Sequence, residues 1–187
     1  MSYAAKKAAE IDGWMEPAEL EWLARQASAR HRILEVGCWK GRSTKALALS
    51  TPGSVFAIDA WDKTLDDPEG TYGEALERGW AAIYTDFLAN LMYERESGKV
   101  KIARCPFQDS DGILANESFN MIFIDGDHRY EAVKRDIAIS FDLAESGALL
   151  CGHDYGNGNP GVDQAVNELV PGHNLMQGGS IWFKEML

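Results

Sequence analysis

Short apolar runs alternate along the chain with longer segments in which apolar residues recur every three or four positions. The short runs predict strands. We place them at Arg32–Gly37, Ser54–Asp59, Val100–Arg104, Asn120–Asp125 and Ala148–Cys151, with a final strand at Ser180–Lys184. Because helical segments separate most of these runs, the pattern predicts an α/β fold built on a mostly parallel sheet with helices on both faces.

The helical segments show their buried faces as apolar stripes. These stripes are Leu20, Leu23, Ala24 and Ala27; Trp80, Ile83, Tyr84, Phe87, Leu88 and Leu91; Val133, Ile137, Phe141 and Ala144; and Val162, Ala165, Val166 and Leu169. Pro17 favours the start of the first of these helices. Residues 60–99 read as an insertion in which Asp62–Gly79 is a long loop before a helix. Such a loop is typical of a binding lid, although a plain insertion explains it equally well.

Composition limits the class of protein. The chain has 187 residues, 45% of them hydrophobic, which predicts one domain over 1–187 with a helical cap at 1–31. It contains no apolar run of the roughly 20 residues that cross a bilayer and no signal-peptide core, so we expect a cytoplasmic protein without a membrane partner. The net charge of −11 argues against a nucleic-acid partner. The three cysteines, Cys38, Cys105 and Cys151, fit buried reduced thiols.

The segment Glu35–Ser43 reads as a strand end, a glycine turn and a helix start. It has two glycines, Gly37 and Gly41, and lacks the third glycine of a dinucleotide fingerprint, which favours an adenosine cofactor without phosphates. An ordinary strand-to-helix turn is the alternative. The segment resembles motif I of class I S-adenosylmethionine-dependent methyltransferases, in which an acidic residue stands two positions before the first glycine, as Glu35 does. The expected cofactor-binding residues here are Glu35, Gly37, Cys38, Trp39, Gly41 and Ser43.

Further cofactor contacts are expected where the next strands end. Asp59 closes the second strand, and its paired oxygens suit two ribose hydroxyls, although a capping aspartate is the alternative. Ala60 and Trp61 follow it. Trp61, like Trp39, could cover apolar parts of the cofactor or belong to the core. After the third strand, Gln108 is followed by an aspartate as in catechol O-methyltransferases, and this resemblance implies that Gln108 contacts adenine.

The candidate chemistry follows the fourth and fifth strands, in the segments Asp125–Tyr130 and Cys151–Tyr155. Asp125 and Asp154 should converge at the mouth of the sheet, where two carboxylates suggest a hard divalent cation such as magnesium. His128 can then accept the proton of a hydroxyl group, because imidazole titrates near neutral pH.

These segments resemble the metal-assisted O-methyltransferases that act on catechols and macrolide sugars. Over its length the chain resembles the bacterial methyltransferase 24 family. The resemblance implies a Rossmann-like class I methyltransferase fold with a seven-stranded sheet, a metal ligand and cofactor contact at Asp125, and a base at His128. The chain departs from the pattern at the fifth strand, where His153 precedes Asp154 in place of a second acidic ligand. Either His153 stands aside, or the site takes manganese, iron or zinc, or no metal binds.

The sequence therefore predicts an S-adenosylmethionine-dependent O-methyltransferase for a hydroxyl group of a small molecule, such as a sugar, a polyketide or a phenol, with Mg²⁺ or Mn²⁺ as a second cofactor. The catalytic candidates are His128 and Asp125, and the metal candidates are Asp125, His153 and Asp154. The alternatives are a nucleic-acid or other N-methyltransferase, a metal-binding hydroxylase, and a homologue that binds without turnover. The last strand, expected at an edge, either finishes the sheet or pairs with a second copy.

Overall fold

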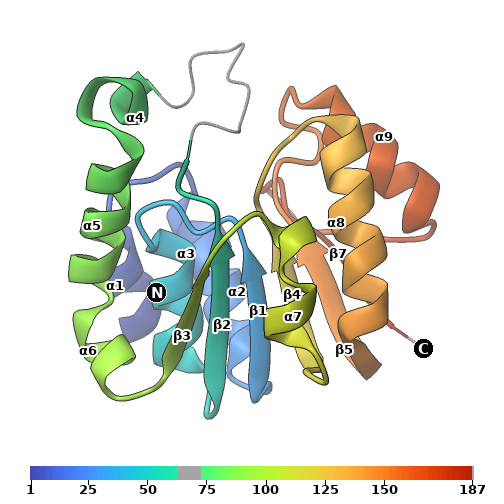
Figure 1. Ribbon diagram of the computed structural model, residues 1–187. Helices are drawn as coiled ribbons and strands as arrows, with labels where there is room; N and C mark the ends of the chain where they lie inside the picture. Colours follow the sequence, from blue (N-terminus) through green and yellow to red (C-terminus); the bar gives the residue numbers. More distant parts are fainter. Residues whose placement is uncertain (63–72, 187) are drawn as a thin grey trace.

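A central sheet organises the part of the chain that the computed structural model describes, residues 1–62 and 73–186. Over these residues the sheet has seven strands in the order β3-β2-β1-β4-β5-β7-β6 (Figure 1). The strands are β1 Arg32–Val36, β2 Ser54–Asp59, β3 Val100–Arg104, β4 Phe119–Ile124, β5 Ala144–Gly152, β6 Asn174–Leu175 and β7 Trp182–Glu185. The first five run parallel, and β7 runs antiparallel to both β5 and β6. The predicted α/β class and mostly parallel seven-stranded sheet are confirmed.

Helices cover both faces of this sheet (Figure 1). On one face lie α1 Tyr3–Ala9, α2 Pro17–Ala27, α3 Arg42–Ser50, α4 Gly73–Arg78 and α5 Trp80–Asn90, followed along the chain by α6 Met92–Glu96; on the other lie α7 Asp111–Leu114, α8 Tyr130–Leu143 and α9 Pro160–Leu169. Successive residues of β1 divide between the two cores: Ile33 packs on the first face and Leu34 on the second. This alternation is the period-two geometry of a strand buried on both sides.

The structure corrects the sequence prediction in the insertion. The predicted loop Asp62–Gly79 contains a helix, α4, over Gly73–Arg78; the remainder, 63–72, lies outside the described residues. Ala75 is the buried residue of this helix, and Glu74 and Arg78 form an ion pair one turn apart. A short helix held by one buried alanine and one surface pair leaves no apolar stripe in the sequence.

Three further expectations change at the later strands and helices. β5 begins at Ala144 rather than Ala148, because α8 ends directly in the strand and Ala144 pairs with Phe119. The last strand is not an edge: β7 lies between β5 and β6, because the two-residue β6 adds a further strand to its outer side. Phe141, predicted on the buried face of its helix, is 37% exposed.

The strand order reverses between β1 and β4, which lie side by side although β2 and β3 separate them in the sequence. Ligands of open α/β sheets bind at the carboxyl ends of the strands beside such a switch point. The fold therefore directs the search for a site to the ends of β1, β2, β4 and β5. Among the described helices, none is long and apolar enough to cross a membrane.

Candidate functional site

A cavity of about 530 Å³ opens at the carboxyl ends of the strands beside the switch point. Its walls come from the turns after β1, β2, β3, β4 and β5, from the segment Gly13–Glu16 before α2, and from Gly178–Ser180 before β7. A cavity of this volume is in the range that holds nucleoside-sized ligands. The predicted residues that line it are Gly37, Cys38, Trp39, Ser43, Asp59, Ala60, Gln108, Asp125, His128, His153 and Asp154.

The glycine turn is shaped by its neighbours in the protein. Gly37 has a φ of +84°, and a Cβ at this position would lie 2.1 Å from the carbonyl oxygen of Asp125. Gly41, with a φ of +89°, would place a Cβ 2.2 Å from the side chain of Leu91. Glycine is therefore required so that β4 can approach the turn closely and α3 can pack near α5. Gly37 lines the cavity, whereas Gly41 does not.

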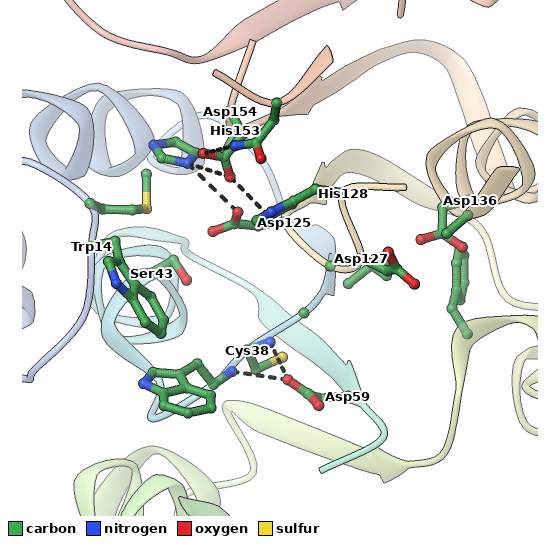
Figure 2. Close-up of a pocket in the computed structure, with 18 of the residues that line it drawn as sticks. Trp14, Cys38, Ser43, Asp59, Asp125, Asp127, His128, Asp136, His153 and Asp154 are labelled. Atoms are coloured by element: carbon green, nitrogen blue, oxygen red, sulfur yellow. Dashed lines mark hydrogen bonds and ion pairs between the residues drawn. The ribbon is translucent and has the colours of Figure 1, made fainter. Parts of the chain in front are cut away.

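Asp59 ties the turn after β1 to the end of β2. Its Oδ2 accepts hydrogen bonds from the backbone N–H groups of Cys38, at 2.8 Å, and Trp39, at 3.0 Å (Figure 2). Its Oδ1 accepts one from Trp61 N–H, at 2.8 Å. Burial raises the pKa of this carboxyl, and the three backbone donors oppose that shift. Oδ1 has one lone pair left, so Asp59 can still accept a hydrogen bond from a ligand at this oxygen.

Glu35 lies behind the cavity wall. The side chain is fully buried, and its Oε1 accepts a hydrogen bond from the hydroxyl of Ser43 on α3. Burial raises the pKa of Glu35 to about 8, against the hydrogen bond from Ser43. Ser43 itself lines the cavity. The acidic residue of the turn thus reaches the cavity through Ser43, as a protonated group at neutral pH.

Two tryptophans with positive φ hold the turn, Trp39 at 48° and Trp61 at 43°. The indole N–H of Trp61 donates to the carbonyl oxygen of Trp39 at 2.8 Å, and the fully buried Trp61 ring packs 4.8 Å from the rings of Tyr84 and Phe87 on α5. Trp61 does not line the cavity, whereas Trp39 does. Trp61 therefore supports the turn from the core.

The loop after β3 closes one end of the cavity. Gln108 is exposed there, in a short 3₁₀ helix, Phe107–Asp109, and Phe107 beside it is buried. Cys105 also lines this end and is half-buried, in contrast to the predicted buried thiol, whereas Cys38 and Cys151 are buried. All three cysteines are free, as expected.

At the other end of the cavity Asp125, His128 and Asp154 converge (Figure 2). Nε2 of His128 lies 3.0 Å from Oδ2 of Asp154. Asp154 has a φ of 66°. Its Oδ1 accepts hydrogen bonds from the side-chain amides of Asn157 and Asn159. Burial raises the pKa of Asp154, but hydrogen bonds to His128 and His153 outweigh it and hold the pKa well below its usual range.

His153 lies between this cluster and the N-terminal helices. Its Nδ1 is 3.1 Å from Asp154 Oδ2 and 3.7 Å from Asp125 Oδ1, while its Nε2 is 3.1 Å from Glu19 Oε2 and 3.0 Å from the Ser180 hydroxyl. Burial lowers the pKa of His153, but Asp125 and the hydrogen bonds to Asp154 and Glu19 raise it to about 11. The imidazole therefore carries a positive charge among carboxylates at neutral pH.

The other carboxyls of the cluster respond to the same charges. Burial raises the pKa of Asp125 to about 6 in spite of His153. Burial also raises the pKa of Glu19, but its hydrogen bond to His153 dominates and brings the pKa to about 2. For His128, burial lowers the pKa, and the hydrogen bond to Asp154 more than compensates, so the net shift is upward.

The donor set of this cluster fits a divalent cation. One ligand atom each from Asp125, His128 and Asp154 lies within 4.8 Å of the others. Carboxylate oxygens suit magnesium and manganese, and an imidazole nitrogen suits manganese, iron or zinc. In this grouping of described residues, His128 stands where the sequence prediction has His153, because both ring nitrogens of His153 already face protein partners.

The sequence analysis did not identify several residues of the site. Glu19 contacts His153, yet its only signal in the sequence is its place three residues after Glu16, typical of a capping box that the structure also contains. Trp80 lines the cavity, with its ring 5.9 Å from that of Trp39. Trp14, 5.2 Å from the Trp39 ring, lies in the segment Ile11–Met15, which the sequence predicts to close the substrate pocket, and it also lines the cavity. Asp136, a buried carboxyl on α8, also lines it.

Solved structures share this fold. The O-methyltransferase TomG of Streptomyces achromogenes, involved in tomaymycin synthesis and crystallised with S-adenosylmethionine, is similar with a TM-score of 0.67 and 16% identity, over 100% of this chain and 91% of its own. An O-methyltransferase of Bacillus cereus, crystallised with S-adenosylhomocysteine, is similar with a TM-score of 0.65 and 16% identity, over 98% of this chain and 89% of its own. At these identities the likeness establishes the fold.

The family of the chain is assigned from its sequence. No curated protein matches the chain. Residues 34–155 match the methyltransferase 24 family, described as a methyltransferase domain, and this match runs from β1 and the glycine turn to the residue directly after Asp154. The segment includes most of the strand ends that build the cavity. Because the match spans more than half of the chain, the chain belongs to the methyltransferase 24 family, as its sequence motifs predicted.

Proposed function

We propose that this methyltransferase transfers the methyl group of S-adenosylmethionine to a hydroxyl group of a small molecule. One observation carries the proposal: the Asp125, His128 and Asp154 cluster lies in the same cavity as the glycine turn and Asp59 (Figure 2). A site for a nucleoside and a site for acid–base chemistry thus lie in one cavity. The S-adenosylmethionine and S-adenosylhomocysteine bound to the two solved relatives support the choice of cofactor.

The cofactor is oriented by the ends of the strands. Asp59 accepts a hydrogen bond from a ribose hydroxyl at Oδ1, which keeps a lone pair after the Trp61 backbone donor. The adenine lies towards Gln108 and Phe107, after β3. The sulfonium end lies towards Asp125, which follows β4 beside the turn. The methyl group then faces the cluster at the other end of the cavity.

The cluster activates the acceptor. Asp125 and Asp154 would hold a divalent cation, which when bound lowers the pKa of an acceptor hydroxyl and fixes it near the methyl group. The Nε2–H of His128 donates to the Asp154 carboxylate, so the hydroxyl proton goes to the other ring nitrogen, Nδ1. Asp154 orients this imidazole, and the amides of Asn157 and Asn159 in turn hold the Asp154 carboxylate.

The acceptor is proposed to be a sugar, polyketide or phenol. Trp14, Trp39 and Trp80 form an aromatic wall of the cavity. Aromatic faces pack well against the apolar face of a sugar ring and against a phenolic ring. Within the part of the chain that the structure describes, Trp14 is 56% exposed and so reaches the cavity mouth, where an acceptor would enter.

The proposal is tested by measuring S-adenosylhomocysteine formation with a catechol, a nucleotide sugar and a polyketide alcohol as acceptors, with Mg²⁺, with Mn²⁺ and with a chelator. With an acceptor that turns over, we expect His128→Gln to lower kcat by about 10²-fold or more and to leave S-adenosylhomocysteine affinity within about twofold, because the base acts in proton transfer. The control is His31→Gln, an exposed histidine outside the cavity lining. Equal kcat in the two variants would contradict the role of His128.

Metal binding needs a readout separate from turnover. Electron paramagnetic resonance of Mn²⁺ titrated into the protein reports bound cation directly. We expect Asp154→Asn to weaken Mn²⁺ binding by about tenfold or more, because a ligand charge is lost. The same substitution at exposed Asp142 should leave it unchanged. Mn²⁺ that stays free in the wild-type protein would contradict the metal site and leave His128 to act with the ionised His153 beside it.

A further inference from the structure

A buried carboxyl on α8 has no role in the chemistry described above. Asp136 lies on the second turn of the helix, is 6% exposed and lines the cavity. Within the described residues 1–62 and 73–186, its carboxyl oxygens have no hydrogen-bond partner. Burying a carboxyl without a partner is costly, so a side chain placed in this way indicates a ligand that supplies the donor.

Gly126 lies close to Asp136 in the lining of the cavity. Gly126 follows Asp125 at the end of β4, and a Cβ built on it would lie 3.7 Å from Oδ2 of Asp136. The carboxyl is therefore within van der Waals reach of Gly126, and both residues line the cavity. In Figure 2 Asp136 lies apart from the Asp125, His128 and Asp154 side chains, at the right of the view beyond Asp127.

The position of Asp136 matches the end of the cavity that the cofactor base would occupy; this step rests on the cofactor orientation proposed above. With the ribose at Asp59 and the sulfonium towards Asp125, the remaining end is bounded by Phe107, Gln108 and Asp136, all of which line the cavity. Phe107 supplies an apolar surface there, and the other two side chains supply polar groups.

Gln108 and Asp136 differ in what they can recognise. An amide presents both a donor and an acceptor, and by rotating it can match an amino group or a carbonyl group of a purine. An ionised carboxylate can only accept. It therefore pairs with the 6-amino group of adenine and repels the 6-oxo group of hypoxanthine. The ionised carboxylate therefore distinguishes these two bases in a way that a freely rotating amide does not.

We propose that Asp136 accepts a hydrogen bond from the exocyclic amino group of the cofactor's adenine and so selects an adenosyl over an inosyl nucleoside. Burial raises the pKa of Asp136 to about 7, and Arg135 opposes the shift, so the ionised form is within reach at neutral pH before any ligand is bound. A donor from the ligand would favour this form further. The residue thus acts in cofactor specificity, separate from the methyl-transfer cluster.

The test is calorimetric titration of the protein with S-adenosylhomocysteine and with its hypoxanthine analogue, S-inosylhomocysteine. We expect the wild-type protein to bind the adenosyl compound at least about tenfold more tightly, the range of one hydrogen bond to a charged group. Asp136→Asn keeps the shape and adds a donor that can face a 6-oxo group, so the ratio of the two affinities should fall by about tenfold. Asp142→Asn, an exposed position on the same helix, should leave the ratio unchanged.

Wild-type protein alone gives a second test that does not depend on folding of the variant. The 7-deaza analogue of S-adenosylhomocysteine keeps the 6-amino group and should bind like the parent compound. A wild-type protein that binds the adenosyl and inosyl compounds equally, or an Asp136→Asn variant that keeps the wild-type ratio, would overturn the role of Asp136. Failure of the wild type to bind any of these nucleosides would instead overturn the cofactor site on which the inference rests.

Discussion

Glu35 offers a test of the buried glycine-turn architecture that needs no knowledge of the substrate. Its side chain is fully buried, with one oxygen bonded to Ser43 and the other without a partner among the described residues. Burial raises its pKa from 4.5 to about 8. Glu35→Gln keeps the shape of the neutral acid and removes its titration, so the difference between the two proteins isolates this one carboxyl.

Proton linkage gives the sign and the size of the expected change in unfolding free energy with pH. Because the folded pKa lies above the unfolded one, the folded state binds the additional proton between pH 4.5 and about 8, and the stability of the wild type falls as pH rises through this window. At ~1.4 kcal/mol per unit, the shift corresponds to ~5 kcal/mol as an upper limit. Relative to Glu35→Gln, the free energy of unfolding of the wild type should fall by several kcal/mol between about pH 5 and about pH 9.

The assay is urea unfolding of both proteins across this pH range, with Glu96→Gln, the same substitution at an exposed position, as the control. The comparison cancels the contributions of other carboxyls, which the variants share. A difference in unfolding free energy that stays constant from about pH 5 to about pH 9 would refute the claim that Glu35 is buried as a neutral acid.

Two further predictions concern the turn itself. Gly37→Ala places a Cβ 2.1 Å from the Asp125 carbonyl at a φ of +84°, and should cost about 3 kcal/mol or more of unfolding free energy in thermal or urea unfolding; Gly98→Ala, with positive φ but open space, should cost about 1 kcal/mol. Equal costs would contradict the close approach of the strands. Asp59→Asn should weaken S-adenosylhomocysteine binding by about tenfold in calorimetry, because the turn loses a charged acceptor; unchanged affinity would place the ribose elsewhere.

Much of the fold was readable from the sequence because buried parallel strands are apolar throughout and end in distinctive residues. The strands predicted to end at Asp59 and at Arg104 have the same first and last residues as β2 and β3 in the structure. Helix α4 was missed because a six-residue helix with one buried side chain has no stripe. The interior position of β7 was missed because it depends on β6, two exposed residues without an apolar pattern.

The sequence identified the site residues that directly follow strands and missed those that lie on helices and other segments. Asp125 and Asp154 could be expected to converge because parallel strands bring their carboxyl ends to one edge. Glu19 and Ser180 could not be placed beside His153, because their contact depends on how α2 and the segment before β7 fold over the sheet. Asp136 could not be identified because it lies in a helix that the sequence marks only by its apolar residues. Its position close to Gly126 depends on how this helix packs on the sheet.

The measurement that tests the central claim most directly is calorimetric titration of the metal-stripped protein with S-adenosylmethionine and, separately, with NAD. The two-glycine turn and the Asp59 carboxyl predict micromolar binding of S-adenosylmethionine, about −8 kcal/mol, and no binding of NAD. Binding of NAD in place of S-adenosylmethionine would contradict the cofactor assignment and, with it, the methyl transfer proposed for the Asp125, His128 and Asp154 cluster.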